Sequence, residues 1–81
     1  MSALIMLRHN RPVRPTAKDV KKYRADHQCG AYEAQNALEA IWRRKMLKNI
    51  KDAAKSETAP VGRDTLEAML MDLVDVVEST L

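Results

Sequence analysis

Apolar residues recur at intervals of three and four along most of the chain, which is the spacing of one face of an α-helix. Three segments carry this spacing, at about 17–28, 32–56 and 65–80. The middle segment is the longest, and its apolar positions are Leu38, Ile41, Trp42, Met46, Leu47, Ile50, Ala53 and Ala54. The pattern predicts a small all-α protein of three helices, in which residues 16–81 form a single helical domain.

Local signals mark where these helices begin and end. Thr16 is a favourable N-cap, and Asp19 lies in the first turn, where the helix dipole favours negative charge. We expect Gly30 to end the first helix in the left-handed conformation. The segment SETAPVGRD contains proline and glycine, which predicts a loop, and Asp64 with Glu67 three residues later predicts a capping box for the last helix.

Residues 1–15 break the helical pattern and predict an extended, basic N-terminal arm. Its apolar segment, ALIML, is compatible with a short strand or with an anchor that packs on the helices. Pro12 and Pro15 lack an N–H donor, so neither a helix nor a central strand continues through them. Arg8, Arg11 and Arg14 recur at every third position, which keeps them roughly in line on an extended arm.

The last helical segment has more apolar positions than one buried stripe needs. They are Leu66, Met69, Leu70, Met71, Leu73, Val74, Val76, Val77 and Leu81. We therefore expect this helix to pack on two sides, against the middle helix and against either a second copy or a partner. The candidates for such an apolar interface are Trp42, Met46, Leu70, Val74 and Val77, and a place in the core is the other interpretation of Trp42 and Met46.

The length of 81 residues allows one domain with a marginal core, because a chain this short buries only about 60% of its unfolded surface. Chains of this size often gain stability by forming oligomers or by docking on a partner. Cys29 has no second cysteine to pair with, which fits a reducing compartment. No apolar run approaches the roughly 20 residues of a membrane span, so we expect a soluble, cytoplasmic protein.

Charge divides the chain into a basic and an acidic part. Residues 1–55 hold 13 Lys and Arg against five acids, a net charge of +8, whereas residues 56–81 hold one Arg against six acids, a net charge of −5. The cations predicted to contact a protein or nucleic-acid partner are Arg8, Arg11, Arg14, Lys18, Lys21, Lys22, Arg24, Arg44, Lys48, Lys51 and Lys55. Docking of the two oppositely charged parts on each other is an interpretation that stays open.

The sequence offers little of the chemistry that catalysis requires. A metal site needs several Cys, His or carboxylate ligands, and His27 with Cys29 forms one pair without a second. A nucleophile needs a neighbouring base, an orienting group and a pocket. Gly30 and Gly62 are the only glycines, so no Gly-rich phosphate loop is present. We therefore expect no enzyme activity, no cofactor and no metal, and a protein that works by binding.

The segment VKKYRADHQCGAYEAQNALE, residues 20–39, resembles the helix-turn-helix of the bacterial ribosomal stalk protein's C-terminal domain. The match consists of a hydrophobic residue, a lysine, Arg24, Gly30 six residues later, Glu33, Ala34 and Glu39. In that family the hairpin offers a basic helix surface to partner factors. The resemblance implies that Lys21, Lys22 and Arg24 contact a protein partner.

The N-terminal half also resembles the ribbon-helix-helix repressors, with LIMLRHNRPVR in the place of the strand, followed by a helix, a glycine turn and a helix. In that family the strand pairs with that of a dimer mate and enters the major groove. This second resemblance implies a dimeric DNA- or RNA-binding regulator that uses the arm and the first helix.

Taken together, these features predict a small, non-catalytic helical protein that docks on a larger protein and modulates or inhibits it. The partner would present an acidic or apolar groove, and nucleic-acid-handling machinery is a candidate. The small size is typical of factors encoded by phages or prophages. The alternative is the dimeric DNA/RNA-binding regulator, and whether the chain pairs as a homodimer stays open.

Overall fold

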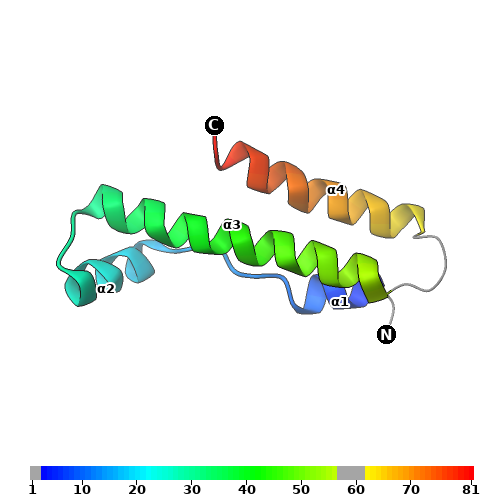
Figure 1. The fold of residues 1–81 in the computed structure, drawn as a ribbon, viewed down its shortest axis with the longest axis horizontal. Helices are drawn as coiled ribbons and strands as arrows, with labels where there is room; N and C mark the ends of the chain where they lie inside the picture. Colours follow the sequence, from blue (N-terminus) through cyan, green and yellow to red (C-terminus); the bar gives the residue numbers. More distant parts are fainter. Residues whose placement is uncertain (1–2, 57–61) are drawn as a thin grey trace.

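The computed structural model describes residues 3–56 and 62–81, which form four helices and no strand. Helix α1 covers Ala3–His9, α2 covers Ala17–His27, α3 covers Ala31–Ser56 and α4 covers Arg63–Glu78. The all-α class is confirmed for these residues, whereas the predicted number of three helices is wrong. The molecule measures 48 × 25 × 15 Å because the 26-residue α3 runs along most of its length (Figure 1).

The additional helix, α1, replaces part of the predicted extended arm. Residues 3–9 are helical, and residues 11–16, here called the linker, then run without regular secondary structure to the start of α2 (Figure 1). Ala3 and Leu7 are fully buried and pack in one cluster with Ala53 of α3 and Met69 of α4. The segment ALIML therefore packs on α3 and α4 as an anchor, which is one of the two alternatives predicted for it; the other was a short strand.

A buried hydrogen bond fixes the end of α1. The Asn49 side-chain amide donates from Nδ2 to the carbonyl oxygen of Leu7 over 2.9 Å. The last carbonyls of a helix have no partner within the helix, so this amide satisfies a group that burial would otherwise leave unpaired.

Helix α2 begins at the predicted cap and ends in an unpredicted way. The Thr16 hydroxyl accepts from the backbone N–H of Asp19 over 3.3 Å, and the Asp19 carboxylate accepts from the backbone N–H of Thr16 over 2.9 Å. This reciprocal pair is a capping box. At the other end, the left-handed residue is Gln28, with φ 51° and ψ 48°, so the prediction for Gly30 is wrong.

Helices α3 and α4 form an antiparallel hairpin whose core lies between them (Figure 1). A second buried cluster joins Trp42 and Met46 of α3 to Val76 of α4. One face of the hairpin is covered by α1 and the linker, since α1 contacts both α3 and α4. Among the described helices, α2 contacts α3 alone, and it buries none of its own residues.

The start of α4 differs from the predicted capping box. Gly62 occupies the N-cap position without a side-chain hydrogen bond, and Asp64 lies inside the first turn. Glu67 pairs instead with Arg63, whose Nε lies 3.1 Å from Oε1 of the carboxylate. The capping-box prediction is therefore wrong. Residues 57–61 of the predicted loop lie outside the described residues.

Candidate protein-interaction surface

Helix α4 turns one apolar stripe to the core and a second one to solvent. Met69 and Val76 are buried against α3 and α1. The second stripe is 40% to 61% exposed, and we call it the outer α4 face: Leu66, Leu70, Leu73, Val74 and Val77. Intervals of three and four residues place these side chains on one side of the helix. Helix α4 therefore carries an apolar surface that the described part of the chain leaves uncovered.

The outer α4 face points away from the linker and α1. A helical residue advances by about 100° around the axis. Asp72, which binds the linker, therefore lies about 60° to one side of the buried Met69, whereas Leu70 lies about 100° to the other side. The exposed stripe and the α1 layer consequently flank the core on opposite sides of the hairpin.

Helix α3 extends the exposed apolar surface beside α4. Arg43 donates to the Ser79 carbonyl oxygen over 3.4 Å, so α4 lies on the Arg43 side of α3. Ala40, Leu47 and Ala54 follow one another at intervals of seven residues and lie about 20° to 60° from Arg43 around the helix, on the side away from the core. Leu47 is 39% exposed. We call these three residues and the outer α4 face together the docking face.

Charges of opposite sign border the docking face on its two edges. The α4 edge carries the exposed acids Glu67, whose carboxylate pairs with Arg63, and Glu78. The α3 edge carries the exposed cations Arg44, Lys51 and Lys55, which surround Leu47 together with Lys48. An apolar centre with a charged rim is the usual composition of a protein-binding surface.

Two of the three predicted arm arginines are bound within the molecule. Arg11 forms a two-pronged ion pair with the buried Asp72, with Nη2–Oδ1 at 2.9 Å and Nε–Oδ2 at 3.3 Å. Arg14 lies 3.8 Å from the Glu39 carboxylate and places its guanidinium 4.9 Å from the centre of the Trp42 ring. These arginines therefore hold the linker against α3 and α4.

The remaining predicted cations lie on separate elements. Arg8 is exposed on α1, at the opposite end of the molecule from α2 (Figure 1). Helix α2 carries four of them, and all are exposed: Lys18, Lys21, Lys22 and Arg24. The structure therefore does not bring the eleven predicted cations together into one patch.

The five predicted interface residues divide into a buried and an exposed group. Trp42 and Met46 belong to the core, with 5% and 2% of their surface exposed. Leu70, Val74 and Val77 lie on the outer α4 face. The predicted set omits Leu47, Leu66 and Leu73. Leu66 and Leu73 lie three or four residues from the predicted Leu70 and Val77, and this helical spacing is the sequence signal that would have identified them.

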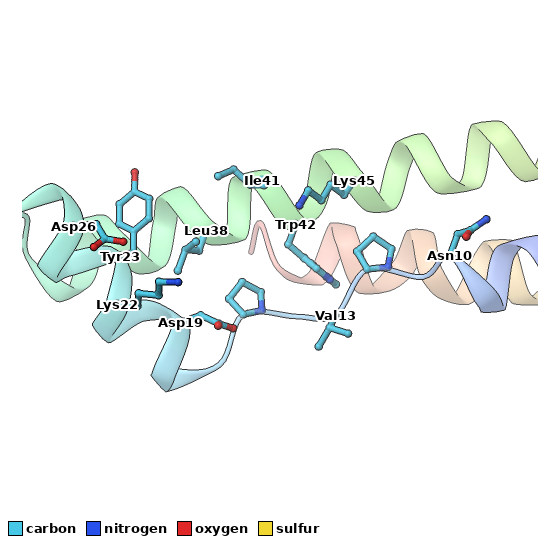
Figure 2. A pocket seen from close by; sticks show the side chains of 12 residues that line it. Asn10, Val13, Asp19, Lys22, Tyr23, Asp26, Leu38, Ile41, Trp42 and Lys45 are labelled. Carbon is cyan, nitrogen blue, oxygen red and sulfur yellow. The ribbon is translucent and has the colours of Figure 1, made fainter.

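A groove of about 500 Å³ runs between the linker, α2 and α3 (Figure 2). Val13, Tyr23 and Trp42 are among the side chains that line it, together with charged residues such as Lys22 and Asp26. The Trp42 indole N–H is buried and meets no acceptor among the described residues. The lining of the groove mixes apolar and charged groups, in contrast to the continuous apolar centre of the docking face.

The residues discussed for metal or nucleophilic chemistry make local structural contacts. The rings of Tyr23 and His27 stack with their centroids 3.9 Å apart, and His27 Nδ1 donates to the Tyr23 carbonyl oxygen over 3.1 Å. Within residues 3–56 and 62–81, no three His, Cys, Asp or Glu side chains are grouped so that they could hold a metal ion. None of the described helices has the length and apolar character to cross a bilayer.

Comparisons with protein-family models, curated proteins and solved structures find no match to this chain. The resemblances to the ribosomal stalk domain and to the ribbon-helix-helix repressors therefore stay predictions. The docking face, with its apolar centre and its two charged edges, is the observation on which a functional conclusion depends.

Proposed function

We propose that this protein is a non-catalytic interaction protein that docks on a larger protein through the docking face and modulates or inhibits it. The exposed apolar stripe of α4 is the observation that supports this proposal. Soluble monomers rarely leave a contiguous apolar patch of more than a few hundred Å² uncovered, and larger patches mark binding surfaces. Full burial of one exposed leucine contributes about 1.5–3 kcal/mol, so several half-exposed ones supply a substantial driving force.

The rim gives the partner a defined chemistry. An apolar groove on the partner would receive Leu70 and its neighbours, while cations beside that groove would face Glu67 and Glu78. Acids on the opposite side would face Lys51 and Lys55. Complementary rim charges set orientation and speed association more than they raise affinity. Occupying such a groove would block or reposition whatever else binds there, which is how a chain without catalytic groups would inhibit or modulate.

Site-specific photo-crosslinking tests this proposal. A benzophenone side chain at position 70 would lie in the interface, and the same group at the exposed Ala25 of α2 serves as the matched control. We expect a larger protein from the native cells to crosslink from position 70 and not from position 25. The further change Val74→Asp should abolish this crosslink while helicity is retained. Identical crosslinks from both positions, or none from position 70, would contradict the proposal.

Nucleic-acid binding is a second candidate, and the cations along α3 favour it. Four cations border one hollow on the exposed side of the helix, and Asp52 lines it beside them: Arg44, Lys48, Lys51 and Lys55. Binding by these groups would release counterions from phosphates and weaken steeply with salt. Lys48→Ala combined with Lys51→Ala should lower the slope of log affinity against log salt by about one for each phosphate that the variant no longer neutralises. Negligible binding to a duplex at low salt would exclude this function.

A further inference from the structure

We infer that, in the free protein, a second copy of this chain covers the docking face, so that two α3–α4 hairpins form a twofold-symmetric four-helix bundle. The inference rests on the proposed function in one respect, namely that the docking face binds protein. A larger partner would then compete with the second copy for the same surface.

The shape of the docking face suits a copy of itself. Its α4 side is a ridge with intervals of four, three and four residues along Leu66, Leu70, Leu73 and Val77, roughly 17 Å long. Its α3 side is lower, because Ala40 and Ala54 flank the single large residue Leu47 at intervals of seven. These intervals belong to helices that pack side by side at small angles in bundles. The α4 ridge of one copy therefore fits against the lower α3 row of the other copy, and each copy supplies one ridge and one row.

Charge selects one of the two symmetric ways to bring the faces together. With the twofold axis across the helices, α3 meets α3 and the cationic edges face each other. With the axis parallel to the helices, each α3 lies antiparallel to α4 of the second copy, and each cationic edge meets an acidic edge. Juxtaposed like charges oppose association, and opposite charges favour it. The second arrangement is therefore the one we propose.

Contacts within the hairpin fix the register of this arrangement. Arg43 donates to the Ser79 carbonyl oxygen, Met46 shares a buried cluster with Val76, and Ala53 shares one with Met69. We infer from these contacts that the two residues of each pair lie at about the same height along the hairpin. Rotation about an axis parallel to the helices does not change height along them. Each α3 residue therefore lies opposite the α4 residue of the second copy that is level with it.

This register pairs the charges of the two edges one by one. The antiparallel correspondence continues along the helices, so Arg44 faces Glu78 of the second copy and Lys55 faces Glu67 of the second copy. The same register sets Leu47 between Val74 and Val77 of the second copy. Because of the symmetry, each contact occurs twice in the dimer.

Sedimentation equilibrium of the full chain tests the dimer. From about 1 μM to about 1 mM, a range that covers weak and moderate affinities, we expect the mass to rise from the 9.2 kDa monomer to twice that value. Leu70→Glu should keep the chain monomeric without loss of helicity, because Leu70 is 61% exposed in the monomer. Lys21→Glu on α2 serves as the control and should leave the dimer intact.

Charge reversal tests the arrangement. Lys55→Glu and Glu67→Lys should each weaken the homodimer by about fivefold or more in Kd, since each variant places like charges in both copies of the contact. Mixed together, the two variants should form a heterodimer of restored affinity, because both contacts then pair opposite charges. A mixture that associates no better than either variant alone would overturn the α3-on-α4 arrangement.

The two proposals fail in distinguishable ways. A wild-type chain that stays monomeric at every concentration, or a dimer that Leu70→Glu leaves unchanged, overturns the dimer. A monomeric chain that still crosslinks a larger protein from position 70 shows that such a partner is the sole occupant of the face. A dimer that forms without a crosslink to a larger protein overturns the proposed function and still supports the four-helix bundle.

Discussion

At the scale of single residues, the turn between α2 and α3 shows a left-handed residue that is not glycine. Gln28 has a φ of 51°, while Gly30, two residues later, has a negative φ. The left-handed region costs an ordinary L-residue about 1 kcal/mol relative to glycine. The sequence predicts a turn here, but the residue with positive φ depends on how α2 returns onto α3, which local composition does not specify.

Two substitutions in this turn, one at each of these positions, form a matched pair of variants. Gln28→Gly should raise the free energy of unfolding by about 0.5–1 kcal/mol, because it removes the left-handed strain. Gly30→Ala should change it by less than about 0.5 kcal/mol, because a Cβ there meets no atom within 4 Å and φ is already negative. Urea denaturation measures both. A stabilising Gly30→Ala together with a destabilising Gln28→Gly would contradict this account of the turn.

At the scale of elements, α1 marks the limit of what a hydrophobic pattern predicts. Isolated helices shorter than about 12–15 residues are marginal in water, and α1 has seven. It is stabilised by the burial of Ala3 and Leu7 and by the Asn49 amide. None of these contacts is visible in ALIML itself, which is also compatible with a strand. The predicted ranges for α2, α3 and α4 differ from the observed ones by two residues at most, because these helices are long and periodic.

Helix α2 should be the element most sensitive to acid. Hydrogen bonds from the backbone and then the hydroxyl of Thr16 lower the pKa of Asp19 below its ordinary value of 3.8. A carboxylate whose pKa is lower in the folded state stabilises that state fully above its unfolded pKa and loses this effect as pH falls through the folded pKa. The stabilisation of α2 is therefore fully present above about pH 4 and is lost as pH falls further, through the lowered pKa of Asp19.

Carbon chemical shifts of α2 measured by NMR between neutral and strongly acidic pH check this expectation. The helical shifts of α2 should decrease in the acid range before those of α3, because α2 has no buried residue to support it. Asp19→Asn should remove the titration, since the amide keeps an acceptor oxygen and carries no charge. An acid transition of α2 that is unchanged in Asp19→Asn would assign the effect to another group.

At the scale of the whole molecule, an ion pair between residues 61 apart in the chain closes the fold. Arg11 and the buried Asp72 tie the linker to α4 and thereby hold the linker on the face of the α3–α4 hairpin that α1 also covers. Arg11→Ala should lower the free energy of unfolding by about 2 kcal/mol, because it leaves a buried carboxylate without its partner. Arg14→Ala is the matched control and should cost less than about 1 kcal/mol, because its pair with Glu39 is longer and more exposed.

Urea denaturation of the two variants, with a double-mutant cycle of Arg11→Ala and Asp72→Asn, measures this difference. We expect a coupling energy of about 1–3 kcal/mol between Arg11 and Asp72. Equal losses from Arg11→Ala and Arg14→Ala, with no coupling, would show that the linker is held by packing alone.

The candidate site was predictable only where it depends on one helix. The wide apolar arc of the last segment predicts that Leu70 and Val74 have more than the core to contact, and the structure leaves them exposed. The burial of Trp42 and the pairing of Arg11 depend on the path of the linker over α3. That path is set by contacts between distant parts of the chain, so the spacing of residues within one segment does not predict it.

The position of the turn between α2 and α3 allows the orientation of the two copies to be measured as a distance between spin labels. Cys29 is the only cysteine, and its turn lies at one end of a molecule 48 Å long, away from α1 (Figure 1). With the twofold axis parallel to the helices, spin labels on the two thiols would lie at the same end of the assembly. With the axis across the helices, the labels would lie at opposite ends. A single electron-spin distance therefore distinguishes the two orientations without any change to the docking face.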